Sequence, residues 1–170
     1  MKQFILSVAL SLVFAVFAVA QTSTFSDVNA EYTFDLPDAI WKIVIKPTVT
    51  SPNVEYAYQD RLDGHLEIRK LKIGETELIS DLILRDQEQK LQFLPGYVTG
   101  KEEPFAGAFK GRAFNYEFVR FGKNMSGRFY YLKADDSTVY VLRFTGLSNK
   151  LRVIRNQTDS IARTFKLKDK

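Results

Sequence analysis

Residues 127–165 constrain the fold more than any other stretch of the chain. Two closely spaced strands are predicted there, at residues 128–134 and 138–145, and an amphipathic helix follows them. The helix carries a stripe at steps of four and three with only one polar member: Leu147, Leu151, Ile154, Thr158, Ile161 and Phe165. Burying a large apolar side chain contributes roughly 1.5–3 kcal/mol, whereas ordering the backbone costs about 1–2 kcal/mol per residue, so the helix needs a sheet to dock on.

The size and composition of the chain suit one domain. Its 170 residues are 45% hydrophobic and 14% aromatic, and we expect a single core-bearing domain at residues 30–168. Charge is uneven: residues 21–100 carry 8 basic and 13 acidic side chains, whereas residues 101–170 carry 15 and 7. Such an asymmetry bears on partners rather than on fold. The absence of cysteine excludes disulfides, thiolate metal sites, a cysteine nucleophile and a lipid-anchored cysteine.

The N-terminus has the three parts of a signal peptide. Lys2 is a short positive segment, residues 4–17 are an apolar run, and Ala18-Val19-Ala20 is a small-residue cleavage site. We therefore expect a signal peptide at residues 1–20 and a polar, flexible leader at residues 21–29. The alternative is an uncleaved membrane anchor, but the run is near the lower limit for a spanning helix. The mature protein is expected to be soluble, periplasmic or extracellular, and without a membrane span.

Alternating apolar residues predict an antiparallel meander of four strands after the leader. They are placed at residues 31–36, 41–45, 54–58 and 66–73. Pro37 ends the first strand because proline cannot donate a ladder hydrogen bond. Asp63-Gly64 is a hairpin turn signal, and Lys70 marks a possible bulge in the fourth strand.

A first helix is predicted at residues 76–94, where Pro95-Gly96 ends it. Asp86 and Lys90 project into its apolar face, so we expect the middle of this helix to be exposed or slightly overwound. The glycine-containing residues 97–111 predict a short strand, an irregular excursion at residues 102–108 and a return to the sheet. A strong strand follows at residues 112–121, and turns are predicted at residues 122–127 and 135–137.

No motif for catalysis or metal binding emerges. His65 is the single histidine and, without cysteine, lacks the partners of a catalytic triad or a zinc site, so we interpret it as a surface strand residue. The acidic groups at residues 60–67 and 135–136 lack the spacing of a calcium loop and are interpreted as solvated turn acids. The glycines at 100, 107 and 111 form no nucleotide-binding loop. We predict no catalytic residue, no metal ligand and no cofactor.

Two charged features suggest partners. Arginines interleaved with the aromatic strands superficially resemble a nucleic-acid stacking platform, but core packing explains one face of each strand and an exported protein rarely meets nucleic acid. We therefore expect no nucleic-acid partner. The second feature is a basic stripe on the exposed side of the terminal helix, which is either an ordinary solvated face or a docking surface for an acidic protein or an anionic envelope component. Its residues are Lys150, Arg152, Arg155, Arg163 and Lys166.

Three packing motifs resemble the PsbP-like superfamily, which includes DcrB-like periplasmic proteins. They are Tyr32-Thr33-Phe34-Asp35-Leu36-Pro37 with Trp41 after it, the aromatic strands at residues 114–121 and 138–144, and Ile161-Ala162-Arg163-Thr164-Phe165. The resemblance covers residues 31–167, with Ile40 and Thr164 where the family has glycine and serine. It implies an α+β fold, an α/β/α sandwich in which helices pack on an antiparallel sheet. It also implies a non-catalytic role in binding or assembly, without a transferable set of functional residues.

The expected function is that of an exported, non-catalytic accessory or binding module that acts through its surface in the periplasm or envelope. Two alternatives stay open: a small-ligand carrier that uses a cleft between sheet and helix, and an enzyme with an unrecognised site. A carrier requires an apolar cavity, whereas an enzyme requires a pocket of polar groups with perturbed protonation.

Overall fold

The computed structural model describes residues 22–74 and 76–168, so the predicted signal peptide at residues 1–20 lies outside the described part. The strands are β1 (Ser23–Phe25), β2 (Tyr32–Leu36), β3 (Trp41–Ile45), β4 (Val54–Tyr58), β5 (Asp60–Lys72), β6 (Val98–Ala106), β7 (Lys110–Arg120), β8 (Lys123–Asp135), β9 (Thr138–Leu147) and β10 (Lys166–Leu167). The helices are α1 (Ile79–Gln89), the 3-10 helix η1 (Leu91–Phe93), α2 (Ser148–Val153) and α3 (Arg155–Thr164).

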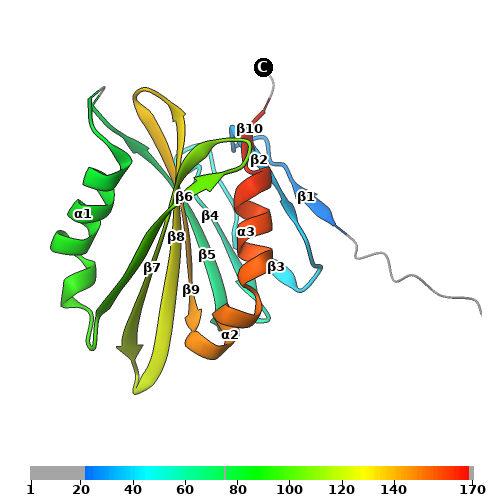
Figure 1. Ribbon diagram of the computed structural model, residues 1–170. Coiled ribbons are helices and arrows are strands. Elements are labelled where there is room, and N and C mark those ends of the chain that lie inside the picture. The colour runs from blue at the N-terminus through cyan, green and yellow to red at the C-terminus, as the bar shows by residue number, and fades with distance from the viewer. Residues whose placement is uncertain (1–21, 75, 169–170) are drawn as a thin grey trace, which may run out of the picture.

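Seven strands form one antiparallel sheet in the order β3-β4-β5-β9-β8-β7-β6, and β1-β2-β10 form a second, small sheet. Figure 1 shows α1 against one face of the large sheet and α3, with the small sheet beside it, against the other. The prediction of an α+β fold with helices on an antiparallel sheet is confirmed. Among the described residues, no helix has the length and apolar character needed to cross a bilayer.

The terminal helix buries five of the six residues of the predicted apolar stripe, in two pieces. The sixth, Leu147, is the last residue of β9, is only partly buried and packs against the cluster beneath α1. The break is at Ile154, which ends α2 with φ −92° and ψ 11°. Thr158, Ile161 and Phe165 have no exposed area. The ring of Phe165 lies 5.0 Å from that of Tyr32 and 5.1 Å from that of Tyr140, measured between centroids. The main core is therefore held between the large sheet, α3 and the small sheet.

The first predicted strand is present but does not join the meander. β2 pairs with β1 and β10 in the small sheet, so only β3, β4 and β5 run as a meander in the large sheet. The expected flexible leader is wrong at residues 23–25, because these form β1. Phe25 is 6% exposed and stacks on Phe34 at 4.9 Å, which supplies the apolar contact that holds this segment.

The turn between β4 and β5 is at Gln59, whose φ is 58°, and not at Asp63-Gly64 as predicted. Gly64 lies inside β5, where a Cβ would stand 2.9 Å from Ile154 Cδ1. This glycine makes room for the break between α2 and α3 rather than for a turn. β5 and β9 pair without interruption from His65 to Lys72, so the bulge predicted at Lys70 is absent.

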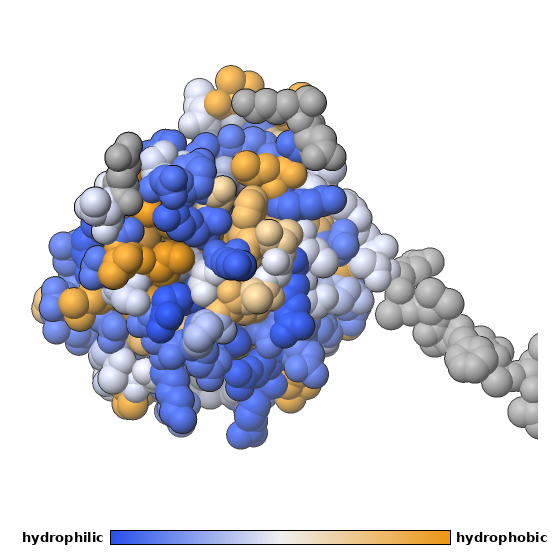
Figure 2. All heavy atoms as spheres, turned by 45° about the horizontal axis from the view of Figure 1, so that its top comes forward, coloured by the Kyte–Doolittle hydropathy of each residue, from blue (hydrophilic) through white to orange (hydrophobic). Residues whose placement is uncertain are grey.

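The irregular excursion predicted at residues 102–108 is also wrong, since β6 and β7 form a hairpin with one irregularity, between Thr99 and Glu102. Gly107 is needed because this hairpin touches α3: a Cβ there would stand 2.6 Å from Arg163 Cα. Only Gly122 of the turn predicted at residues 122–127 lies in the turn, which consists of Phe121 and Gly122, because β8 begins at Lys123. Figure 2 brings forward the end of the molecule that is at the top of Figure 1. This surface is largely hydrophilic, with small groups of hydrophobic side chains between charged ones.

α1 is shorter than the predicted residues 76–94, and η1 replaces its last turn. Leu82 and Ile83 are each 1% exposed and pack against aromatic residues of the sheet. Asp86 lies in the same buried face and is 7% exposed, which contradicts the expectation that the middle of this helix is exposed. The physical reason is a set of partners from the sheet, described below.

Candidate functional site

The two faces of the β7–β8 hairpin carry different side chains because strand residues alternate in direction. Asn115 lies on the α3 face, where it bonds to Arg128, whereas Tyr116 and Phe118 belong to the cluster beneath α1. Neither helix covers its face completely. Each face therefore has a hollow toward the end where β7 and β8 are joined, at the bottom of Figure 1.

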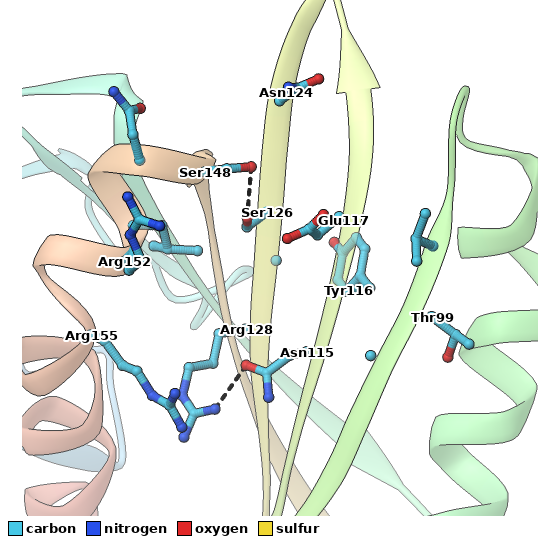
Figure 3. A pocket seen from close by; sticks show the side chains of 15 residues that line it. Thr99, Asn115, Tyr116, Glu117, Asn124, Ser126, Arg128, Ser148, Arg152 and Arg155 are labelled. Atoms are coloured by element: carbon cyan, nitrogen blue, oxygen red, sulfur yellow. Dashed lines mark hydrogen bonds between the residues drawn. The ribbon is translucent and has the colours of Figure 1, made fainter.

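The hollow on the α3 face, which we call the polar groove, has a volume of about 810 Å³. Figure 3 shows Arg152 and Arg155 projecting from the helical wall, with Glu117 and Asn115 on β7 opposite and β8 between the two walls. Side-chain hydrogen bonds connect both walls to β8. Ser126 Oγ donates to Ser148 Oγ of the helical wall at 2.8 Å, and Arg128 donates to Asn115 of β7.

Arg128 forms the inner end of the polar groove and is only 6% exposed. Its guanidinium donates to Tyr130 Oη at 2.6 Å, to Asn115 Oδ1 at 2.8 Å and to Asp159 Oδ1 at 2.9 Å. Burial acts to lower the pKa of Arg128, but Tyr130 and Asp159 outweigh it and hold the pKa above its ordinary value. Arg128 is therefore a fixed positive charge that points between α3 and β7.

The structure divides the five basic residues predicted as a docking stripe, all of which are exposed. Arg152 and Arg155 line the polar groove together. Lys150 instead faces Asp63 at 3.5 Å, Arg163 lies at the far end of α3, and Lys166 is in β10. The prediction had not selected Arg128 as a site residue. A hint of this role was present in the sequence. Asp159 is the one acidic residue between the basic residues of the stripe, and in the structure its carboxylate binds Arg128.

Charges in the polar groove are only partly paired. Arg155 Nη2 is 3.6 Å from Glu103 Oε2, and the same carboxylate is 3.9 Å from Arg128 Nη1. Arg152 has no acidic group within ion-pair distance among residues 22–74 and 76–168, and neither does Glu117 have a basic one. The polar groove thus presents one uncommitted guanidinium, Arg152, on its helical wall and one uncommitted carboxylate, Glu117, on the opposite wall.

The hollow on the opposite face, which we call the apolar cleft, has a volume of about 730 Å³ and lies between the sheet and the C-terminal end of α1 with η1. Its apolar surface is contributed by both walls: Leu62, Leu91, Leu94, Pro95, Phe118, Phe121, Met125 and Phe129. Arg143 and Asp86 stand at its inner end. The apolar cleft differs from the polar groove in chemistry, although β7 and β8 contribute to both.

Asp86 binds three neighbours around the inner end of the apolar cleft. Its carboxylate accepts from Tyr131 Oη at 2.8 Å and from Lys90 Nζ at 3.0 Å, and it pairs with Arg143 Nη2 at 3.2 Å. Burial acts to raise the pKa of Asp86, but the bonds from Lys90 and Tyr131 and the charge of Arg143 outweigh it and hold the pKa below its ordinary value. The aspartate is therefore ionised and fastens α1 to the sheet.

Three residues interpreted from the sequence as surface or turn positions, Asp63, His65 and Glu67, lie within β5 and are only partly exposed. His65 is also one of the residues that line the apolar cleft. Its Nε2 is 2.9 Å from Glu55 Oε2 of the neighbouring strand. Within the described ranges, no group of three or more His, Cys, Asp or Glu side chains is placed to hold a metal ion.

No protein-family model and no curated protein matches the sequence. Solved structures do match its fold. A cyanobacterial PsbP, CyanoP from Synechocystis sp. PCC 6803, is 14% identical with a TM-score of 0.57, and the match covers 94% of this chain and 99% of CyanoP. LpqN, involved in cell envelope biogenesis of Mycobacterium tuberculosis, is 15% identical with a TM-score of 0.54 over 88% of this chain and 91% of LpqN. A mutant of the protein Mog1 is 9% identical with a TM-score of 0.63 over 88% and 97%.

Proposed function

We propose that this chain, which has the PsbP-like fold, is an exported, non-catalytic binding module that docks an acidic protein or another anionic envelope component in the polar groove. The observation that carries the proposal is Arg152, exposed at the mouth of the groove and without an acidic partner in the described part of the chain. Arg155 beside it is held only by an exposed ion pair, which a partner carboxylate can replace at little cost.

The inner end of the groove supports the same function. Arg128 is already fixed by Tyr130, Asn115 and Asp159, so the guanidinium needs no reordering when a carboxylate approaches. Preorganised arginines suit planar, acidic groups because their donors match both carboxylate oxygens. An acidic side chain entering between Arg152 and Arg155 would therefore meet the unpaired guanidinium of Arg152 first. Behind it lie Arg155 and Arg128, which are paired with Glu103 and Asp159.

Export is the second part of the proposal. It is supported by the signal-peptide pattern of residues 1–20 and agrees with the envelope role of LpqN, which shares the fold. N-terminal sequencing of the protein recovered from the envelope or medium tests this part. The expected mature protein begins at Gln21, and a protein that keeps residues 4–17 and stays in the membrane would contradict it.

The groove is tested by two double variants of equal charge change. Arg152→Glu with Arg155→Glu reverses the groove, whereas Arg163→Glu with Lys166→Glu reverses two basic residues outside it. Binding of the purified domain to envelope fractions is measured for both at low and high salt. We expect the groove variant to lose binding, the matched variant to keep most of it, and the wild type to bind more weakly at high salt, since screening acts over about 10 Å at 0.1 M.

Equal losses in the two double variants would show that only the overall positive charge matters, which contradicts docking in the groove. Binding that resists both salt and the groove reversal would eliminate this surface altogether. Folding of each variant is checked by circular dichroism, because all four positions are exposed and no loss of structure is expected.

A further inference from the structure

The tip of the β7–β8 hairpin carries an aromatic residue in a backbone conformation that does not suit it. Phe121, with φ 51°, and Gly122, with φ 69°, are the two residues between Arg120 and Lys123, which makes a type I′ turn. Glycine and asparagine suit these angles, whereas a bulky side chain is strained by roughly 1–2 kcal/mol.

Phe121 also gains little from folding, because the residue is 82% exposed. The backbone strain is a cost of folding, and the exposed ring contributes little apolar burial against it. Backbone outliers of this kind concentrate at functional sites, where the side chain is needed for something other than stability. Phe121 is therefore the starting point for a second site.

Phe121 lies on the rim of the apolar cleft. Behind it, Phe118, Met125 and Phe129 form a wall of buried side chains from β7 and β8, and Leu91 of η1 lies among the residues of the other wall. The volume of about 730 Å³ falls within the range of roughly 300–1,000 Å³ typical of small-molecule sites. The cleft therefore has the size and the apolar surface that a small ligand requires.

The charges around the cleft indicate the sign of such a ligand. Four basic side chains line it, Arg61, Lys90, Arg120 and Arg143, against the single acid Asp86. Arg61 is paired with Glu55, and Lys90 and Arg143 share Asp86, so these charges are committed. Arg120 has no acidic partner in the described ranges and lies 5.2 Å from the centre of the Phe121 ring.

We propose that the apolar cleft binds a small amphiphilic anion, an apolar chain or ring with one acidic head group. Its apolar body lies between Phe118 and Leu91, and its head group pairs with Arg120 beside the ring of Phe121. The site uses the face of the sheet opposite to the polar groove, so it is independent of the acidic partner proposed above. The small-ligand carrier, left open as an alternative by the sequence, would use this cleft between the sheet and α1 with η1.

Calorimetric titration with decanoate and with decyltrimethylammonium, both below their micelle concentrations, tests the ligand class. The two probes share a ten-carbon chain and differ in the sign of the head group. We expect saturable decanoate binding with a negative heat-capacity change, because apolar surface is buried, and at least tenfold weaker binding of the cation. Absent decanoate binding, or equal affinity for the two probes, would overturn the proposal.

Two variants and a control test the site itself. Phe121→Asn keeps a residue that suits the turn, so it should raise the unfolding temperature while it weakens decanoate binding about fivefold. Arg120→Gln should weaken decanoate binding about two- to fivefold through loss of the exposed pair. Lys123→Gln, on the other flank of the same turn and outside the cleft, should leave the affinity unchanged.

The opposite signs expected for Phe121→Asn separate a binding role from a structural one, because a structural aromatic would lower the unfolding temperature when removed. Co-sedimentation with phosphatidylglycerol vesicles separates the cleft from a membrane contact made by the exposed hairpin tip. If Phe121→Asn abolishes vesicle binding and leaves decanoate affinity unchanged, the aromatic serves a membrane surface and the proposal is overturned. Loss of decanoate affinity in Phe121→Asn and Arg120→Gln, with Lys123→Gln unaffected, supports it.

Discussion

The two faces of the large sheet repeat one arrangement of three side chains in different surroundings. Tyr130 and Tyr131 are neighbours on β8 and point to opposite faces, and each donates its hydroxyl to an aspartate of the helix that covers its face. A strand arginine completes each set. We call Arg128, Tyr130 and Asp159 the α3 triad, and Arg143, Tyr131 and Asp86 the α1 triad.

The triads differ in how much else supports them. The side chain of Asp159 is 23% exposed, and Arg128 keeps bonds to Asn115 and Tyr130 if the aspartate is lost. The side chain of Asp86 is 9% exposed and is the nearest acidic partner of Arg143. The aspartate is therefore one of several partners of the strand arginine on the α3 face, whereas on the α1 face it is the nearest acidic partner of the arginine.

The largest effect is expected from the apolar contacts of the α3 face. Ile161→Asp places an unpaired charge where no area is exposed, so it should cost several kcal/mol and unfold the domain. Val153→Asp is the matched control, because Val153 of α2 is 80% exposed, and it should unfold at nearly the wild-type temperature. Thermal unfolding followed by circular dichroism measures both. An unchanged midpoint for Ile161→Asp would show that the stripe is not buried.

A smaller effect should distinguish the triads directly. Asp86→Asn leaves Arg143 half-paired beneath α1, and removing one partner of a buried pair costs roughly 3–5 kcal/mol. Asp159→Asn should cost only about 1 kcal/mol, because Arg128 retains two neutral acceptors and the site is open to water. Urea unfolding of the two variants gives the free energies. Equal losses would remove the asymmetry between the faces.

The pH dependence of stability should carry the signature of the α1 triad. The pKa of Asp86 is lower in the folded protein than its ordinary value of 3.8. Its contribution to the free energy of unfolding is therefore fully present above pH 3.8 and is lost as the pH falls below that value toward the folded pKa. Urea unfolding at a series of pH values from neutral to strongly acidic should show a smaller acid loss for Asp86→Asn than for the wild type. If the free energy of unfolding fell equally with pH in both proteins, Asp86 would not contribute to acid stability as the α1 triad requires.

Local periodicity explains why much of the fold was predictable from the sequence. The stripe of the terminal helix and the alternation of Phe114, Tyr116 and Phe118 are properties of single segments. Burial in the structure confirms the alternation in β7 and, from Leu151 to Phe165, the stripe. In β9 most residues are buried, because both faces of the sheet are covered there. The resemblance carried by these motifs is confirmed at the level of fold. The small sheet was not predicted because β1 and β10 have three and two residues, too few for a pattern.

Interactions between distant segments explain most of what the sequence did not show. Asp86 interrupts an apolar helix face and therefore suggested exposure, but its partner Arg143 comes 57 residues later. Glycine signals were ambiguous in the same way, since Gly64 and Gly107 serve close packing against the α2–α3 segment rather than a turn or an irregular loop. Arg152 and Arg155 were found because a helical stripe is local, whereas the hollow that they line with β7 is not.

The smallest effect is expected at the rim of the polar groove. Arg155 and Glu103 are 53% and 42% exposed, and exposed ion pairs contribute roughly 0–1 kcal/mol, so Arg155→Gln should lower the free energy of unfolding by no more than about 0.5 kcal/mol. Arg152→Gln should leave it unchanged, since Arg152 forms no ion pair within the described residues. Any difference between the variants should vanish at high salt in urea unfolding, because salt screens exposed pairs. A loss above 2 kcal/mol for Arg152→Gln would mean that this arginine stabilises the fold. The rim of the polar groove would then hold no charge free for a partner, and it would no longer differ from the α1 triad, in which the charges are paired.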